Sequence, residues 1–341
     1  MNRRLLTMLV GGILLLVLGV FGTQLPVPYA QLSPGPTLDT LGAVDSQDII
    51  SVSGRTPNKT AGHLNLTTVS VTDNLNLLDA LRGWIDDDTS VVPRAEIFPP
   101  DKTPEQVDQE NTQAFTDSEN AAVVAALHEL NMPDRVVVTS IAGDNSPSKG
   151  KLRIRDALVS VDGVQVKDLD GLTALLTARE PGKKVRVVYL RENKETSTEV
   201  TLTKAANRGG GALGITVEVR PVAPYDIDIK VGEDIGGPSA GLMFALGILE
   251  KVGPVELTAG RYIAGTGTID NDGTVGPIGG IPLKMIAARH VGAEVFLVPA
   301  DNCQEAKGDH PDGLMLVKVT SLHQALEALA TLRRGGFPEG C

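Results

Sequence analysis

The chain has 341 residues, a formal net charge of −11 at pH 7 and two cysteines. That length allows two or three domains, and the acidic balance, without a basic patch interleaved with aromatic residues, argues against nucleic acid as a partner. The five histidines show no metal-ligand spacing, so we expect neither a metal nor a cofactor.

An apolar run at the N-terminus predicts a membrane anchor over residues 1–25. Residues 5–22 are almost wholly apolar, and Arg3 and Arg4 precede them. The run is just long enough to cross a membrane, and no Lys or Arg follows before Arg55. The positive-inside rule therefore places the first residues in the cytoplasm and the rest outside. A cleaved signal peptide is the alternative, but its apolar core is shorter, and the Pro-Val-Pro-Tyr-Ala segment after the run is a poor cleavage site.

The segment from 26 to 131 carries mixed signals. We expect it to pack on a body formed by the C-terminal part of the chain, with the domain between them as an insertion. Its expected elements are a tight turn at 32–37, a strand at 64–71, a helix at 75–85, a loop at 93–108 and a helix at 118–130 capped by Asp117 or Ser118.

A small β-rich domain is predicted for residues 132–206. Its expected elements are strands at 136–141, 157–161, 184–191 and 199–203, and a helix at 170–179. This order, with the segments Asp156-Ala-Leu-Val-Ser-Val-Asp-Gly163 and Pro181-Gly182, resembles a PDZ domain of the bacterial protease type.

The PDZ resemblance implies a module that adds an extended peptide, often a free C-terminus, to the edge of a sheet. The sequence departs from the family at Arg155, where Gly usually precedes the Asp, and at residues 140–151, which are polar where a carboxylate-binding loop is expected. A small domain that only spaces or shapes its neighbour is the alternative.

Further along, a serine follows a glycine-rich loop at residues 232–237. Pro238 suits the first turn of a helix, and residues 242–249 read as a buried helix. Ser239 would then lie in the first turn, beside unpaired backbone N–H groups that can stabilise an oxyanion. The small neighbours that leave room for a substrate backbone are Gly237, Ala240 and Gly241. An ordinary helix start with a capping serine is the alternative.

A lysine lies where an apolar side chain is expected. Pro282 opens a second predicted helix over residues 283–291, and Lys284 shares its apolar stripe with Ala287 and Ala288. Burial lowers the pKa of a lysine, as a general base requires. A lysine that reaches from the rim to water is the alternative. Together, the serine and the lysine suggest a nucleophile and its general base.

Residues from about 213 to about 329 resemble the proteolytic domain of the Lon family, which uses a Ser-Lys dyad. The segments that carry the resemblance are Gly237-Pro-Ser-Ala-Gly241, Thr266-Gly-Thr-Ile269, Gly273-Thr-Val-Gly-Pro-Ile-Gly-Gly280, Lys284, Ala287-Ala288, Pro299 and Asn302. The resemblance implies Ser239 as the nucleophile, Lys284 as the base and Thr266 as the residue that orients the lysine. We expect this domain at residues 207–335 and a tail at 336–341.

The sequence also departs from the Lon pattern. Gly236 stands where many Lon enzymes carry Asp, and Glu233 and Asp234 are shifted and receive no catalytic role. These 341 residues contain no Gly-x-x-x-x-Gly-Lys-Ser/Thr loop, the nucleotide-binding motif of the usual ATPase module. The expectation is a peptidase that works without bound nucleotide on unfolded or flexible chains.

The expected fold class is α+β, with a transmembrane helix and a PDZ-like domain inserted before a C-terminal Lon-type α/β domain. This order resembles the membrane-anchored, PDZ-containing Lon-like peptidases of Gram-positive bacteria. The expected function is a serine endopeptidase outside the cytoplasm, whose PDZ-like domain recruits peptide ligands or gates access.

Other readings stay open. A non-catalytic PDZ adaptor on a retired protease fold and a site-specific processing peptidase are the two alternatives. The Lon resemblance implies a homo-oligomeric ring such as a hexamer. Cys303 and Cys341 could pair outside the cell, although spacing alone does not decide this.

Overall fold

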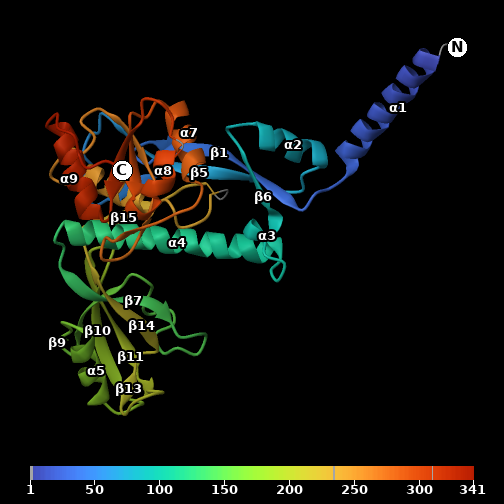
Figure 1. Ribbon diagram of the computed structural model, residues 1–341. Coiled ribbons are helices and arrows are strands. Elements are labelled where there is room, and N and C mark those ends of the chain that lie inside the picture. The colour runs from blue at the N-terminus through green and yellow to red at the C-terminus, as the bar shows by residue number, and fades with distance from the viewer. Residues whose placement is uncertain (1–2, 233–234, 309) are drawn as a thin grey trace. The chain divides into compact units, whose positions relative to one another are not determined.

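The computed structural model describes residues 3–232, 235–308 and 310–341 and divides into two compact units (Figure 1). Unit 1 combines Met1–Ile50, Lys59–Ala122 and Ile229–Cys341, and unit 2 combines Ser51–Asn58 and Val123–Asp228. The architecture is mixed α+β, as expected from the sequence.

The helices are α1 (Arg3–Gln24), α2 (Leu77–Ile85), α3 (Arg94–Ile97), α4 (Pro104–Glu129), α5 (Leu169–Thr177), α6 (Gly241–Val252), α7 (Ile281–His290), α8 (Cys303–Gly308) and α9 (Leu322–Arg333), with a 3-10 turn η1 (Ala300–Asn302). The strands are β1 (Tyr29–Asp39), β2 (Ala43–Val44), β3 (Gln47–Asp48), β4 (Ile50–Ser53), β5 (His63–Thr72), β6 (Ser90–Pro93), β7 (Asp134–Ile141), β8 (Ala157–Val161), β9 (Val164–Gln165), β10 (Lys184–Arg191), β11 (Lys194–Thr201), β12 (Thr203–Lys204), β13 (Gly211–Ala212), β14 (Ile215–Pro221), β15 (Asp226–Ile229), β16 (Tyr262–Gly265), β17 (Thr268–Ile269), β18 (Val275–Gly276), β19 (Val295–Pro299) and β20 (Met315–Val319).

The sheet of unit 1 has the strand order β20-β19-β16-β5-β1-β6. Its strands β5, β16, β19 and β20 run parallel, whereas β1 pairs antiparallel with both β5 and β6. Every residue of β19 is buried, which explains its continuous apolar sequence. Helix α6 is buried along its whole length and is apolar on all sides up to Leu249, while its last turn carries the buried Glu250 and Lys251. In open α/β sheets, sites form outside the carboxyl ends of parallel strands, and Thr266 follows β16 at that edge.

The tight turn expected at residues 32–37 is wrong, because these residues belong to the long strand β1. The pairing of β1 with β5 shifts register between Pro34 and Thr37. A Cβ added to Gly35 would come within 2.3 Å of Thr68 Oγ1. This glycine therefore permits a close approach of two strands, and the irregular register accommodates the prolines.

The loop expected at residues 93–108 is wrong in part, since it contains α3 and the first turns of α4. Helix α4 begins at Pro104, not at a cap at Asp117 or Ser118. Thr103 Oγ1 accepts a hydrogen bond from Gln106 N (3.3 Å), and Gln106 Oε1 accepts one from Thr103 N (2.8 Å). These reciprocal bonds form a capping box ahead of a proline in the first turn.

Unit 2 contains an antiparallel sheet with the order β11-β10-β8-β7-β14, and β9 pairs with β8. Its core buries Leu158, Val187 and Leu202 together with Leu172 and Leu176 of α5. The predicted strands and the helix of residues 134–204 are confirmed, with ends shifted by a few residues.

Arg155 keeps the backbone conformation that a glycine would favour. Its φ is +74°, in the left-handed region. The following Asp156 is buried and accepts a hydrogen bond from Arg191 Nη2 at 2.7 Å. The turn is therefore preserved despite the substitution, and the Arg191 pair fixes the aspartate behind it.

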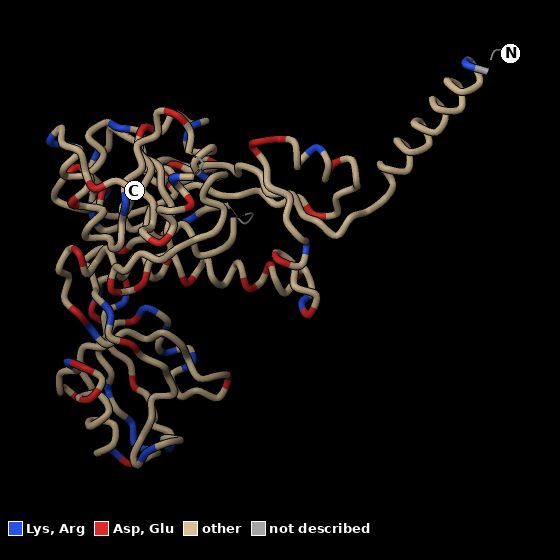
Figure 2. The backbone as a smooth tube through the Cα atoms, viewed as in Figure 1, with Lys and Arg blue, Asp and Glu red and all other residues tan. Residues whose placement is uncertain are grey.

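Helix α1 is long and apolar enough to cross a membrane. Its Leu6–Gln24 window has a mean hydropathy of 2.3. Figure 2 shows no acidic or basic residue along α1 beyond its first turn. By length and composition, α1 qualifies either as a membrane span or as a signal sequence.

The two cysteines are paired. Cys303, at the start of α8, forms a disulfide with Cys341, at a sequence separation of 38 residues. Both pack against the buried cluster that contains Met285 and Phe296. The tail before Cys341 is also held by Lys318 N, which donates to Glu339 O at 3.0 Å.

Replacing both cysteines, Cys303→Ser with Cys341→Ser, should lower the free energy of unfolding by roughly 2–4 kcal/mol, because the bridge restricts the unfolded chain. Denaturant unfolding of unit 1 with and without reductant measures this loss. The intact protein should show no reactive thiol by mass spectrometry. An unchanged unfolding midpoint, or two thiols that react in the native protein, would contradict the pairing.

Candidate functional site

Ser239 lies just before α6, at the end of a loop rich in glycine. The expectation that Pro238 and Ser239 form the first helical turn is wrong by two residues, because Ala240 is the N-cap and α6 begins at Gly241. Gly237 has a φ of +86°, a conformation that favours glycine. Ser239 therefore still faces the positive end of α6.

Lys284 lies in the first turns of α7, on the side that faces the core. Gly280, the N-cap of α7, has a φ of +72°, and a Cβ there would come within 2.8 Å of Val69 Cγ2. This glycine lets α7 begin close against β5. Lys284 is only 3% exposed, so its predicted place on the apolar stripe is confirmed.

The two side chains meet although they are 45 residues apart in the chain. Lys284 Nζ donates to Ser239 Oγ at 2.7 Å and to Thr266 Oγ1 at 3.0 Å. Burial lowers the pKa of Lys284 to about 8, because the charged form loses hydration there. With that pKa, roughly a tenth of the Lys284 amine is neutral at pH 7 and can accept the hydroxyl proton of Ser239.

Thr266 connects the lysine to the backbone of the serine. It is fully buried, and its Oγ1 donates to the carbonyl oxygen of Ser239 at 3.0 Å. Gly267 N donates to the same carbonyl at 2.9 Å. The carbonyl of Ser239 is thus held from two sides, and Thr266 accepts from the lysine with its remaining capacity.

A second hydroxyl, which the sequence did not single out for the site, holds the other side of the serine. Ser118 is 5% exposed in the middle of α4, and its Oγ donates to the carbonyl of Pro238 at 3.0 Å. Two turns earlier along α4 lies Asn111, whose carbonyl accepts from Gly237 N at 3.0 Å. Because the Pro238 carbonyl and the Ser239 N–H share one rigid peptide plane, Ser118 also fixes the direction of that N–H.

Backbone donors remain next to the serine. Among the described residues, no group accepts a hydrogen bond from the N–H of Ser239 or of Ala240. Leu242 N, by contrast, donates to Gly267 O. The arrangement therefore leaves N–H groups beside Ser239 Oγ that can bind a developing oxyanion.

Gly236, the departure from the Lon pattern, lies against α4. A Cβ at position 236 would come within 3.1 Å of Asn111 Cβ, so the helix leaves little room for an aspartate there. Glu233 and Asp234 lie outside the described residues.

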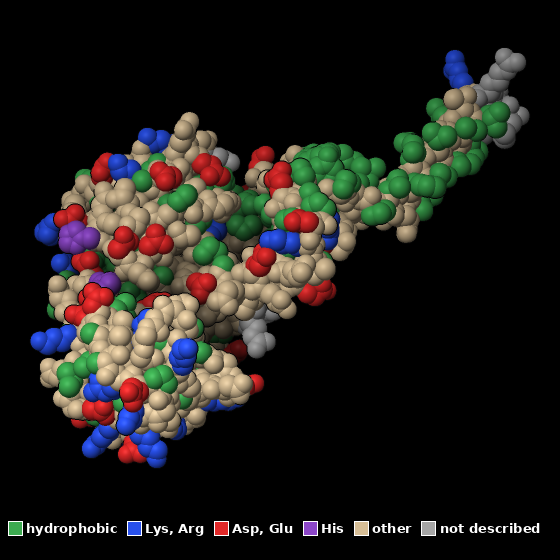
Figure 3. Space-filling view, turned by 90° about the horizontal axis from the view of Figure 1, so that it is seen from below, with side chains coloured by type: hydrophobic (Ala, Val, Ile, Leu, Met, Phe, Trp, Pro, Cys, Tyr) green, Lys and Arg blue, Asp and Glu red, His purple; other side chains and the backbone are tan. Residues whose placement is uncertain are grey.

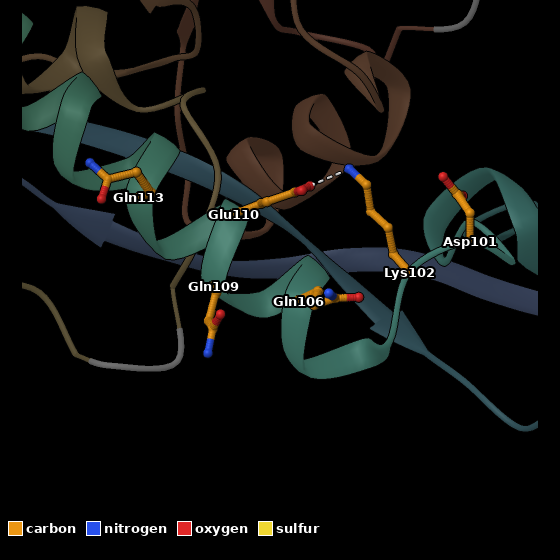
Figure 4. Close-up of a pocket in the computed structure, with 6 residues that line it drawn as sticks. All are labelled: Asp101, Lys102, Gln106, Gln109, Glu110 and Gln113. Carbon is orange, nitrogen blue, oxygen red and sulfur yellow. Dashed lines mark hydrogen bonds and ion pairs between the residues drawn. The ribbon is translucent and has the colours of Figure 1, made fainter.

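One hollow in the surface does not include the residues of the site. It is lined by polar residues near the start of α4, where Lys102 Nζ pairs with Glu110 Oε2 at 2.6 Å (Figure 4). It contains neither Ser239 nor Lys284. Within the described residues, no cluster of His, Cys, Asp and Glu could hold a metal ion.

Two family models match the chain. Residues 215–331 match the Lon protease (S16) C-terminal proteolytic domain, and residues 110–202 match the PDZ domain. The first match contains Ser239, Thr266 and Lys284.

Curated relatives are full Lon proteases. The chain is 29% identical to Lon protease 2 of Bacillus subtilis over 185 residues, which is 54% of this chain and 31% of that protein. It is 30% identical to Lon protease of Roseiflexus castenholzii over 112 residues, which is 33% of this chain and 14% of that protein. The chain therefore spans less than a third of the length of these relatives.

Solved structures from Listeria resemble about a quarter of the chain. The PDZ domain of an SdrC-like protein from Listeria monocytogenes is 24% identical, over 24% of this chain and 86% of that one, with a TM-score of 0.23. The second domain of a Listeria protein is 26% identical, over 25% of this chain and 84% of that one, also with a TM-score of 0.23. By the two family models alone, the chain combines a PDZ domain with the C-terminal proteolytic domain of Lon proteases.

Proposed function

We propose that this protein is an ATP-independent, membrane-anchored serine endopeptidase in which Ser239 is the nucleophile and Lys284 the general base. The observation that carries the proposal is the bond of 2.7 Å between Lys284 Nζ and Ser239 Oγ in a buried setting that lowers the pKa of the lysine. The Lon proteolytic domain that contains both residues supports the same chemistry.

The reaction follows from this geometry. Neutral Lys284 takes the proton of Ser239 Oγ as the oxygen attacks a peptide carbonyl. The N–H groups at the start of α6 donate to the oxyanion. The protonated lysine then gives its proton to the leaving amine, and an acyl-enzyme forms. A water molecule, deprotonated by the same lysine, releases the acid and regenerates Ser239.

Substrates follow from what the sequence contains. Without a phosphate-binding loop in these 341 residues, we expect no bound nucleotide to drive the unfolding of substrates. Unfolded chains, tails and loops are therefore the proposed substrate class. The PDZ domain supports recruitment of extended peptides or gating of access.

A place outside the cytoplasm fits two features. Helix α1 begins with two arginines, which favours a cytoplasmic N-terminus if the helix spans a membrane. The disulfide between Cys303 and Cys341 is typical of oxidising compartments. A ring of several copies, and the domain borders at 26–131, 132–206, 207–335 and 336–341, stay predictions.

Cleavage of an unfolded protein by the full chain in detergent, without ATP, tests the proposal. Fragments should appear by mass spectrometry and should vanish in Ser239→Ala and in Lys284→Ala, because either change removes one partner of the dyad. Fragments that persist in both variants would contradict the assignment. If folded protein cleaves nothing even with candidate PDZ peptides present, the non-catalytic adaptor becomes the better description. A single cut in one defined partner would indicate a site-specific processing enzyme.

The rate should depend on the protonation of Lys284. Since the folded protein lowers the pKa of this group to about 8, kcat/KM should rise about tenfold per pH unit below that value and level off above it. A pH series with a short fluorogenic peptide measures this. Lys284→Arg should be inactive throughout the series, because a guanidinium stays charged. A profile that is flat from pH 6 to 9 would argue for another base.

Ser118 should matter for turnover more than for binding. In Ser118→Ala the Pro238 carbonyl loses its donor and the oxyanion N–H loses its alignment, so kcat should fall about tenfold with little change in KM. The matched control is Thr116→Ala on the same helix, whose exposed hydroxyl donates only to the carbonyl of Thr112. Equal kinetics in the two variants would rule out a positioning role for Ser118.

A further inference from the structure

Helix α2 carries an apolar face that no described part of the chain covers. Leu77, Leu81, Trp84 and Ile85 are exposed by 37%, 40%, 55% and 82%. Their spacing of four, seven and eight residues from Leu77 places them on one side of a helix. Figure 3 shows hydrophobic side chains gathered in this part of unit 1.

The opposite side of α2 is fixed against the sheet. Ala80 and Gly83 are buried there, and a Cβ at Gly83 would come within 2.7 Å of Val91 Cγ2 on β6. The N-cap Asn76 accepts from Asp79 N at 2.9 Å, and Thr89 Oγ1 donates to the carbonyl of Gly83 at 2.8 Å. The helix therefore cannot turn its apolar face inward without losing this packing.

The same helix is attached directly to the end of α1. Leu77 N donates to Leu25 O at 3.0 Å, and Val27 N donates to Leu75 O at 2.9 Å. A Cβ at Gly22 would come within 3.1 Å of the Leu78 side chain, so the last turn of α1 touches α2. The apolar face thus begins where the apolar surface of α1 ends.

An aromatic pair lies on this junction. Trp84 and Tyr29 form an edge-to-face contact with ring centroids 5.6 Å apart. Trp and Tyr concentrate at the boundary between lipid tails and water, where an apolar ring and a polar N–H or O–H are both satisfied.

From these contacts we propose that the exposed face of α2, formed by Leu77, Leu81, Trp84 and Ile85, lies in the surface of the bilayer that α1 crosses. The occupant is the boundary between lipid headgroups and acyl chains, which suits an amphipathic helix with a large apolar face. This inference rests on the membrane anchor of the proposed function, not on the peptidase chemistry. It seats the proteolytic unit on the membrane surface, so its nearest substrates are chain segments that emerge from that surface.

Trp84 is the single tryptophan of the chain and reports directly on this face. The full chain, reconstituted in phosphatidylcholine vesicles, is compared with and without a nitroxide quencher on the acyl chain near the glycerol. Interfacial helices bury their apolar face about 5–10 Å deep, so Trp84 should lose roughly half of its emission with this quencher. A quencher near the methyl end of the acyl chain should remove less.

Ile85→Asp supplies the matched variant, because an 82% exposed side chain contributes little to folding. It should weaken quenching of Trp84 and raise its access to acrylamide. The control is Val255→Asp, at an apolar position elsewhere in unit 1 that is 43% exposed. It should change neither the quenching of Trp84 by lipid nor its access to acrylamide.

Retention of the chain after an alkaline wash of the vesicles reports on α1 separately. A chain that washes off would overturn both the anchor and this inference, whereas peptide cleavage would still test the dyad. A retained chain with Trp84 open to acrylamide and not quenched by lipid would overturn this inference alone. Shielding from acrylamide without lipid quenching would also overturn it and would indicate coverage by a second copy of the chain.

Discussion

The burial of the Lys284 amine is the constraint on which the site depends. A buried lysine can act as a general base only if its neighbours do not stabilise its protonated, charged form. Its hydrogen-bond partners are the hydroxyls of Ser239 and Thr266, and both are neutral. A carboxylate in either place would stabilise the ammonium form and raise the pKa. Neutral partners and a core that excludes water therefore prepare the amine to accept a proton.

Rigid elements bring the three side chains together. Lys284 comes from α7, Ser239 from the loop before α6, and Thr266 from the carboxyl end of β16. Helix α7 and strand β16 lie in the core. Their packing limits the movement of the loop that carries Ser239. Helix α4 also holds this loop, because Ser118 and Asn111 form hydrogen bonds with the loop backbone. The position of Ser239 Oγ is therefore set by hydrogen bonds to the backbone of residues 237–239 as well as by its own bond to Lys284.

The sequence predicted those features that local patterns encode. The spacing of apolar residues around Lys284 predicted that this lysine lies on the buried side of its helix. The alternation of apolar and polar residues predicted the strands of unit 2. Position 118 was read as a helix cap, because its partner, the Pro238 carbonyl, lies 120 residues away. The capping box formed by Thr103 and Gln106 is a sequence pattern that indicates a helix start. The prolines around it favoured the prediction of a loop instead. Gly35 was predicted to lie in a turn, but it lies in a strand, where the close approach of Thr68 on β5 leaves no room for a side chain.

The pairing of β5 with β16 has a consequence for how the protein acquires activity. Thr67 Oγ1 donates to the carbonyl of Gly265 at a separation of 198 residues, and the Val123–Asp228 part of unit 2 is synthesised in between. Such distant pairing makes folding slow, because a long loop must close before the contact is gained. The parallel sheet that supports Thr266 can close only after most of the chain has been delivered. A nascent chain therefore carries Ser239 before the partners of its hydroxyl are in place. Under the proposed function, this order of assembly delays hydrolysis until the whole body has folded.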